Sequence, residues 1–231
     1  MKKFKLLIGF AVLLVSNLLT NVNAQTIKVG GVSIRIPIPD TSFVSVKKEE
    51  WESISIIAPN SNKLLCVYVL NKDYRKYKSG FSDPINTEKY ATVQIAKGLE
   101  EFEINESQFK EITNSIGKTF KKIDSRTVKK SQNEYNQRTS SDIKIGEPTS
   151  LGCFFSKPNL YGYGILAATE ENGKTIVKAT VVDMIRVKNR CLMIYIIVLY
   201  KGDDSLTWLR NISEKWGDKI LKANQEQIKQ K

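Results

Sequence analysis

The chain has 231 residues, enough for one sizeable domain or two small ones, and its 41% hydrophobic content can bury a core without disulfide staples. Its 36 Lys and Arg residues against 24 Asp and Glu give a formal net charge of +12, which favours anionic partners. It contains no histidine, which excludes histidine-dependent serine and cysteine triads and the common zinc sites.

Residues 1–24 are predicted to be a cleavable export signal. Lysines at positions 2, 3 and 5 precede the apolar run 6–15, and Val22-Asn23-Ala24 then offers small residues to signal peptidase. An apolar run of about 10 residues is too short for a membrane-spanning helix, which needs ~20. We therefore expect a mature chain that starts at Gln25, is exported to the periplasm or secreted, and has no integral membrane span.

Short strand patterns follow the signal. Residues 32–36 alternate apolar and polar side chains, which indicates a half-buried strand that ends at Pro37 and Pro39. The polar segment 71–87 is expected to be a long loop with room for one helical turn, and loops of this length are either functional or mobile. Further extended segments are predicted at 43–46, 51–58, 64–70 and 90–97.

A change of period marks the first predicted helix. Apolar side chains between residues 109 and 120 recur at spacings of three, four and four, which places them on one helical face. Asn105 or Ser107 can cap the start of this helix, and Glu106 lies favourably near it. The stripe consists of Phe109, Ile112, Ile116 and Phe120.

The most polar stretch of the mature chain, residues 123–145, is either an exposed helix or a flexible crossover. It joins two halves, 25–122 and 146–224, and each half is predicted to form several strands followed by one helix. This similarity suggests the hypothesis of a structural pseudo-repeat. The basic side chains here could bind phosphates or an acidic surface, although a solvated crossover is the simpler interpretation. Nucleic acid is not expected, because its binders interleave more aromatic residues. The anion-binding candidates are Lys121, Lys122, Arg126, Lys129 and Lys130.

The second half is organised around an apolar hairpin. Its strands are predicted at 175–187 and 191–200, joined by a tight turn at Lys188-Asn189. The second strand is apolar on both alternating faces, as expected of a strand inside a layered fold. A further strand at 161–169 precedes the hairpin.

A closing helix is predicted after Asp203 or Asp204, with Ser205 as another candidate cap. Asn224 is a plausible stop, and residues 225–231 are expected to form a frayed tail. Its apolar residues repeat at three, four and four, like those of the first helix. The buried stripe is expected to contain Leu209, Ile212, Trp216 and Ile220.

Runs of strands followed by helices favour an α+β fold, here a single domain over 25–224 with helices packed on an antiparallel sheet in a sandwich-like arrangement. The strand at 31–37 and the hairpin and Trp-bearing helix at 191–216 resemble exported bacterial proteins of the PsbP/Mog1-like group. That resemblance implies an antiparallel sheet between helices and an accessory or binding role. It transfers no functional residue to this chain.

Cysteines and acids offer few chemical candidates. Cys66, Cys153 and Cys191 are expected to be small core residues, and if any pair forms a disulfide it is Cys153 with Cys191. Asp183 interrupts an apolar strand face and needs a partner if it is buried. Arg186 or Arg190 could supply that partner as a structural ion pair, and a ligand site is the less favoured alternative.

Aromatic side chains give a second group of candidates. Tyrosines combine apolar area with a polar tip, so they could line a ligand groove, although they more often cover the edge of a sheet. The candidates are Tyr74, Tyr77, Phe81, Tyr161 and Tyr163.

We therefore expect an exported, soluble, non-enzymatic binding or accessory protein of the cell envelope, whose partner is a protein or a small ligand. No catalytic residue, metal site or cofactor is assigned. The alternatives are a carboxylate-dependent hydrolase, which requires two acids in one cleft, and an adhesin that binds anionic surfaces through its basic middle stretch.

Overall fold

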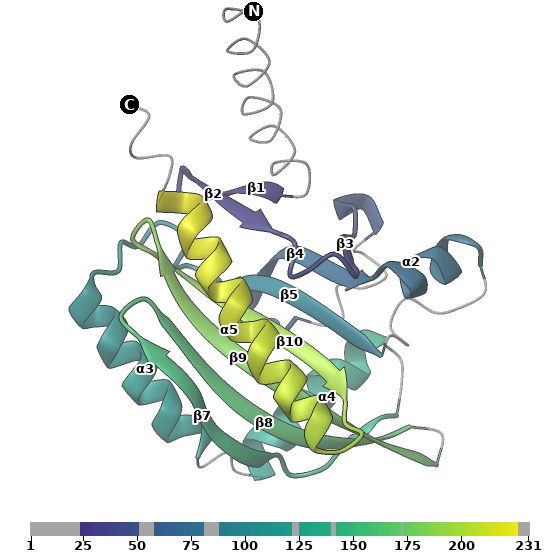
Figure 1. The fold of residues 1–231 in the computed structure, drawn as a ribbon. Coiled ribbons are helices and arrows are strands. Elements are labelled where there is room, and N and C mark those ends of the chain that lie inside the picture. The colour runs from purple at the N-terminus through teal and green to yellow at the C-terminus, as the bar shows by residue number, and fades with distance from the viewer. Residues whose placement is uncertain are drawn as a thin grey trace, which may run out of the picture.

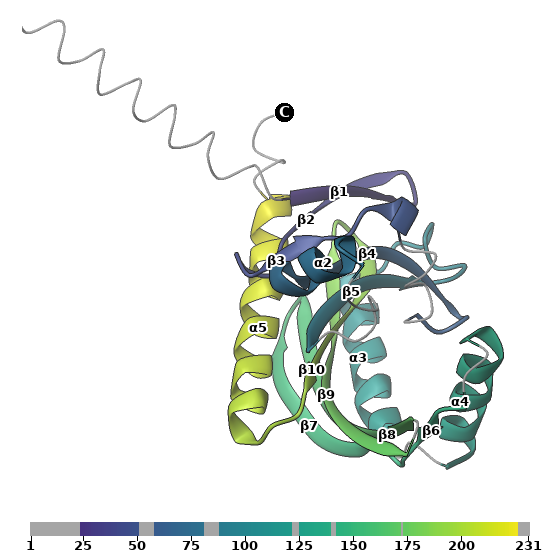
Figure 2. The ribbon, with the colours of Figure 1, turned by 90° about the vertical axis from the view of Figure 1, so that its right-hand side faces the viewer.

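The computed structural model describes residues 24–50, 58–80, 88–121, 125–139, 142–171 and 173–225. Within them the chain forms an eight-stranded antiparallel sheet and a separate two-stranded hairpin, with helices on both faces of the sheet (Figures 1 and 2). The predicted α+β class with an antiparallel sheet is thus confirmed. None of the described helices is long and apolar enough to cross a membrane.

The large sheet has the order β3-β4-β5-β10-β9-β8-β6, and β7 also pairs with β8. Strands β1 and β2 form the separate hairpin. The strands are β1 (Ala24–Val29), β2 (Val32–Pro37), β3 (Phe43–Ser45), β4 (Asn62–Leu70), β5 (Lys89–Ala96), β6 (Lys144–Ile145), β7 (Thr149–Lys157), β8 (Leu160–Glu171), β9 (Lys174–Val187) and β10 (Arg190–Leu199). The helices are η2 (Lys48–Glu50), α2 (Asn71–Lys78), α3 (Glu106–Phe120), α4 (Ser125–Thr139) and α5 (Asp203–Gln225).

The two halves of the chain meet inside one continuous sheet. Strand β5 from the first half pairs with β10 from the second, in a register that runs from Gln94 opposite Met193 to Lys89 opposite Val198. Strand β10 therefore lies between β5 and β9. The face that carries Leu192, Ile194, Ile196 and Val198 is buried, whereas most of the opposite face is half-buried. The burial expected for both faces is thus complete on one of them.

The turn between β9 and β10 follows the prediction from the sequence. Lys188 and Asn189 have φ values of 49° and 60°, as a type I′ hairpin turn requires at its two central positions. Asn adopts this conformation more readily than most residues, so the turn is specified locally.

Helix α5 lies diagonally across one face of the sheet, and α3 lies on the other face (Figures 1 and 2). All four residues of the predicted stripe of α5 are buried. Trp216 donates its indole N–H to the carbonyl oxygen of Pro37 at 2.7 Å and meets the Tyr68 ring edge-on at 5.3 Å. The helix thereby joins the β1–β2 hairpin to the large sheet.

Several segments differ from the prediction. The segment after β4 begins with the full helix α2, where a loop with one helical turn was expected. The basic middle stretch contains helix α4, the first of the two alternatives expected for it. Asn224 does not stop the closing helix, because it lies within α5 and its side chain is buried. The strand expected at 51–58 falls almost entirely outside the described residues, as do the signal segment before Ala24 and the tail after Gln225.

Candidate functional site

Two large apolar side chains are exposed between β5 and α3. Leu99 is 43% exposed and Phe102 is 59% exposed, and in the described ranges they are the large hydrophobic residues most open to solvent. They lie on a segment, residues 97–105, that we call the docking loop. Glu101 and Glu103 on the same loop are also exposed, so apolar and acidic side chains alternate at this surface.

The docking loop is held by hydrogen bonds of its own backbone. The Leu99 amide donates to Ala96 at 3.1 Å and the Phe102 amide donates to Leu99 at 3.3 Å, which makes two successive turns. The Ile104 amide donates to the carbonyl of Asn189 at 2.8 Å. This last bond attaches the loop to the turn between β9 and β10.

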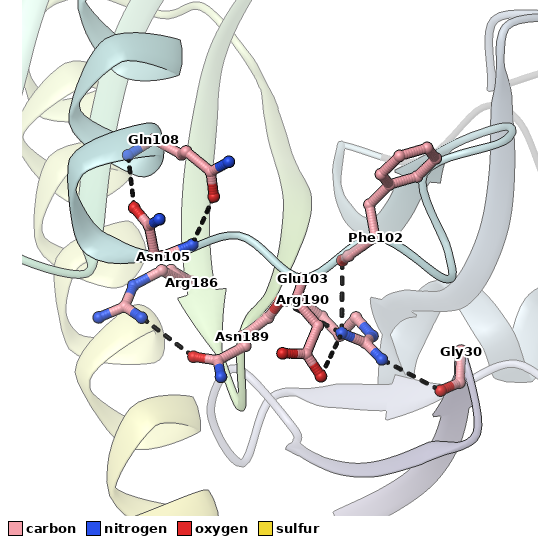
Figure 3. A network of polar contacts seen from close by, with 8 residues as sticks. All are labelled: Gly30, Phe102, Glu103, Asn105, Gln108, Arg186, Asn189 and Arg190. Atoms are coloured by element: carbon pink, nitrogen blue, oxygen red, sulfur yellow. Dashed lines mark hydrogen bonds and ion pairs between the residues drawn. The ribbon is translucent and has the colours of Figure 1, made fainter.

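Arg190 connects the docking loop to the β1–β2 turn (Figure 3). Its guanidinium is nearly buried, and it donates through Nη2 to Gly30 at 3.2 Å and through Nη1 to Phe102 at 3.4 Å, both at carbonyl oxygens. Glu103 lies 3.7 Å from Nη1 and supplies an opposite charge at the surface. Within the described residues Nε has no hydrogen-bond partner. One buried arginine beside the β9–β10 turn thus connects two loops that are far apart in the sequence.

The docking loop ends in a reciprocal cap (Figure 3). The side chain of Asn105 accepts from the Gln108 amide, and the side chain of Gln108 accepts from the Asn105 amide, each at 2.9 Å. This capping box satisfies two amides at the start of α3 and fixes the exit of the loop. The structure therefore confirms Asn105 as the cap, one of the two candidates from the sequence.

Asp183 lies elsewhere and has a different partner from the one expected. Its carboxylate oxygens accept from the Ser213 hydroxyl of α5 at 2.8 and 2.7 Å, and the side chain is fully buried. Burial raises its pKa to about 8, although the hydroxyl of Ser213 opposes the shift. The expected ion pair with Arg186 or Arg190 is therefore not formed.

Arg186 cannot pair with Asp183 for a geometric reason, and Arg190 has other partners. Residues three apart on a strand point to opposite faces, so Arg186 projects away from Asp183 and α5. It donates to the side chains of Asn159 at 2.9 Å and Asn189 at 3.2 Å. Arg190 reaches the docking loop, and both arginines therefore organise turns at one end of the molecule.

The predicted aromatic groove is divided between distant places. Tyr161 and Tyr163 stack on β8 at 6.5 Å, Tyr163 is buried, and Phe120 of α3 packs on it at 5.2 Å. Tyr74 and Tyr77 lie on α2, after β4, with β5, β10 and β9 between them and β8. The structure does not bring these groups together, and Phe81 lies outside the described residues.

Tyr74 takes part in a local hydrogen-bond network. Tyr74 donates to Glu50 at 2.9 Å, and Glu50 also accepts from Lys78 at 2.7 Å. The Lys78 hydrogen bond is the largest of the effects that lower the pKa of Glu50. Burial raises the pKa of Tyr161 to about 12.

The anion-binding candidates are partly gathered. Arg126, Lys129 and Lys130 are exposed on α4, and their spacing of three and four places them on one helical face. Lys121 is exposed just after α3, and Lys122 lies outside the described residues.

The cysteines differ from the prediction in one respect. Cys66 is fully buried and Cys191 is half-buried, but Cys153 is exposed, and all three are free thiols. Cys153 lies on β7 and Cys191 on β10, with β8 and β9 between them. Neighbouring strands lie ~4.8 Å apart, so the two residues are separated by roughly 14 Å, far beyond disulfide reach. In the part of the chain that the structure describes, no group of Cys, Asp and Glu could hold a metal ion.

The docking loop was missed as a site in the sequence. The available signal was the placement of Leu99 and Phe102 among three glutamates, outside any helical or strand period.

No family model matches this chain, and no curated protein sequence matches it either. Solved structures give weak likenesses. PsbP (CyanoP) from Synechocystis sp. PCC 6803 is 9% identical, with 84% of this chain and 90% of that chain covered and a TM-score of 0.39. A mutant of the protein Mog1 is 12% identical, with 89% and 94% covered and a TM-score of 0.33. The Ran-binding protein Mog1p of Saccharomyces cerevisiae is 11% identical, with 88% and 93% covered and a TM-score of 0.31. The fold is thus weakly similar to PsbP and Mog1, in agreement with the resemblance in the sequence.

Proposed function

We propose that this chain is an exported, non-enzymatic accessory protein of the cell envelope, periplasmic or secreted, that binds a protein partner through the docking loop. The observation that carries the proposal is the exposure of Leu99 and Phe102 on a loop whose backbone is firmly held. Exposed apolar side chains framed by polar residues are typical of interaction sites.

The way the loop is fixed favours binding. A side chain or loop that must be ordered on association weakens the complex, whereas a loop already held in place loses little entropy. Arg190 and the bond from Ile104 to Asn189 provide this order before any partner arrives. Phe102 is then suited to fill an apolar pocket of the partner, as aromatic anchors do in many interfaces. Glu101 and Glu103 at the rim favour a partner with basic residues around that pocket.

The hydrolase alternative has less support. It requires two carboxyl groups that face one cleft. Asp183 is enclosed beneath α5 and bound to Ser213, whereas Glu101 and Glu103 are exposed on the docking loop. These acids lie in different environments at separate places in the fold.

Chemical cross-linking in envelope extracts tests the proposal. We expect the chain from Gln25 onward to give a discrete cross-linked complex that Phe102→Ser removes. The control Asn114→Ser changes an exposed residue of α3 and should retain the complex. Both variants should melt at the wild-type temperature. The proposal is wrong if Phe102→Ser and Asn114→Ser capture the same proteins in equal amounts.

Binding to anionic surfaces is the second candidate function, because Arg126, Lys129 and Lys130 share an exposed face of α4. It predicts binding to vesicles that contain anionic lipid at low salt, with loss at high salt. The charge reversal Lys129→Glu with Lys130→Glu should abolish that binding. Equal binding by wild type and this double variant would eliminate the candidate.

A further inference from the structure

A groove of about 450 Å³ runs between the start of α5 and strand β7. Its apolar walls are Leu151, Phe154 and Leu206, and its polar groups include Asp203, Arg210 and Asn211. Its volume lies within the range of small-molecule sites, which combine apolar walls with a few polar groups, and the groove is open to solvent. The groove shares no residue with the docking loop.

Irregularities in β7 place two side chains in this groove. In a regular strand, residues three apart point to opposite faces, so Leu151 and Phe154 could not both face α5. The pairing of β7 with β8 shifts register between Ser150 and Gly152 and again between Cys153 and Phe155. Gly152 has a φ of +81°, a conformation that a β-bulge often requires. These bulges turn both Leu151 and Phe154 toward α5.

A second glycine fixes the ring of Phe154. A Cβ atom on Gly164 would overlap that ring and would lie 3.0 Å from the Cβ atom of Leu151. The absence of a side chain at Gly164 therefore gives Phe154 its seat against β8. The guanidinium of Arg210 lies 4.8 Å from the centre of the seated ring, within the range of a cation–π interaction.

The ring of Phe154 thus positions the guanidinium of Arg210 without using its N–H donors. No acceptor in the described part of the chain hydrogen-bonds its guanidinium, which lies over the ring face of Phe154. A stacked guanidinium still presents its edge, where a carboxylate can accept two parallel hydrogen bonds. Asp203 lies seven residues earlier on α5, about 10 Å along the helix, and would repel a second negative charge.

We propose that this groove binds small monocarboxylates with an apolar body. The carboxylate accepts from Arg210, while the body packs against Leu151, Leu206 and the ring of Phe154. A free organic acid and the terminal carboxylate of a peptide share this chemistry.

Amide NMR titration of the chain from Gln25 onward tests the site. The probes are 3-phenylpropionate for free acids, N-acetyl-leucine for peptide termini, the neutral amide of each, and the dianion phenylsuccinate. We expect at least one monocarboxylate to shift the amides of β7 and of the first turns of α5 at millimolar concentration. Its amide and phenylsuccinate should bind at least about tenfold more weakly, because a charge-assisted hydrogen bond is lost or a repulsion is added.

Variants separate this binding from nonspecific attraction to a basic protein. Arg210→Gln should weaken binding about tenfold or more, and Arg210→Lys should restore only part of it because lysine lacks the planar fork. Phe154→Leu should also weaken binding, since it removes the ring that orients the guanidinium. Lys215→Gln removes the same charge from an exposed position of α5 outside the groove and should leave binding unchanged.

Three results would overturn the proposal: the absence of groove shifts with either monocarboxylate, equal binding of acid and amide, or equal effects of Arg210→Gln and Lys215→Gln. Because Arg210 and Lys215 are both exposed, the two variants should fold alike, and the melting temperature verifies this. The cross-linking experiment on the docking loop involves other residues, so either proposal can fail alone.

Discussion

The carboxyl group of Asp183 lies in the core without a cationic partner. Its two oxygens contact the hydroxyl of Ser213, which can donate to one of them and accept from the other when the acid is protonated. Burial raises the pKa to about 8, so the neutral acid dominates at neutral pH. The sequence predicted that Asp183 needs a partner if it is buried and favoured an arginine, whereas the structure supplies the Ser213 hydroxyl from α5.

This group should make stability depend on pH. The pKa is higher in the folded state than in the unfolded state, so the folded state holds an extra proton between the ordinary aspartate value and about 8. Its contribution to stability is therefore greatest at low pH and falls as the pH rises through that window, by up to about 1.4 kcal/mol per pH unit.

Asp183→Asn should remove this dependence, because the amide does not titrate. Urea unfolding at several pH values should show the variant gaining on the wild type as the pH rises. The control Asp204→Asn, at an exposed position of α5, should follow the wild type. Parallel pH profiles for wild type and Asp183→Asn would contradict the assignment.

Two adjacent glycines allow a matched test of the Arg190 clamp. At Gly30, where φ is +53°, a Cβ atom would collide with the carbonyl oxygen of Glu100 and approach Nε of Arg190 to 2.9 Å. At Gly31, where φ is +73°, a Cβ atom would meet nothing within 4 Å. Gly31→Ala should cost about 1 kcal/mol for its backbone conformation. Gly30→Ala should cost roughly 2–4 kcal/mol, because the collision is added. Denaturant unfolding measures both, and equal losses would show that the clamp tolerates displacement.

Among the elements, α5 is attached to the β1–β2 hairpin near its C-terminal end. Asn224 accepts from the Arg35 amide at 2.9 Å and donates to the Arg35 carbonyl at 2.8 Å, so its amide group pairs with β2 as a neighbouring strand would. It also donates to the Ile220 carbonyl at 2.8 Å. These bonds explain why an Asn predicted to stop the helix is a buried part of it.

Asn224→Ala should loosen this attachment. It removes the two hydrogen bonds to the Arg35 backbone, which costs about 1–3 kcal/mol where these groups are shielded from water. We expect faster hydrogen exchange at the Arg35 amide and little change within β9 and β10. Lys222→Ala, an exposed change in the same turn, serves as the control. Unaltered exchange at Arg35 in Asn224→Ala would mean that the attachment depends on other contacts.

The sequence predicted those elements whose signal is local. The stripe of α5 and the turn at Lys188-Asn189 depend on residues a few positions apart, and both are confirmed. Partners across the fold were harder to predict. The pairing of Asp183 with Ser213 and the reach of Arg190 to Gly30 depend on how α5 and the hairpins meet, which no local period encodes. The docking loop was also hard to predict, because it is held by Arg190 and Asn189, which lie far from it in the sequence.

At the scale of the whole molecule, the order of the sheet determines which side chains can react together. Strands β8 and β9 separate Cys153 from Cys191, and Cys66 lies on β4, beyond β5 and β10. The sequence predicted three small core residues, with a Cys153–Cys191 disulfide only if any pair bonded, and the sheet keeps the three thiols apart. Burial raises the pKa values of Cys66 and Cys191 to about 12, which suppresses their thiolates.

Thiol labelling of the folded chain tests this arrangement. One equivalent of reagent should react rapidly at the exposed Cys153, and Cys66 and Cys191 should react only after unfolding. Cys153→Ser should abolish the rapid phase. A reducing agent should leave the melting temperature unchanged in wild type and variant, because no disulfide closes a loop. Peptide mapping that recovers a Cys153–Cys191 disulfide from the exported protein would contradict the sheet order, because that bond cannot form across two intervening strands.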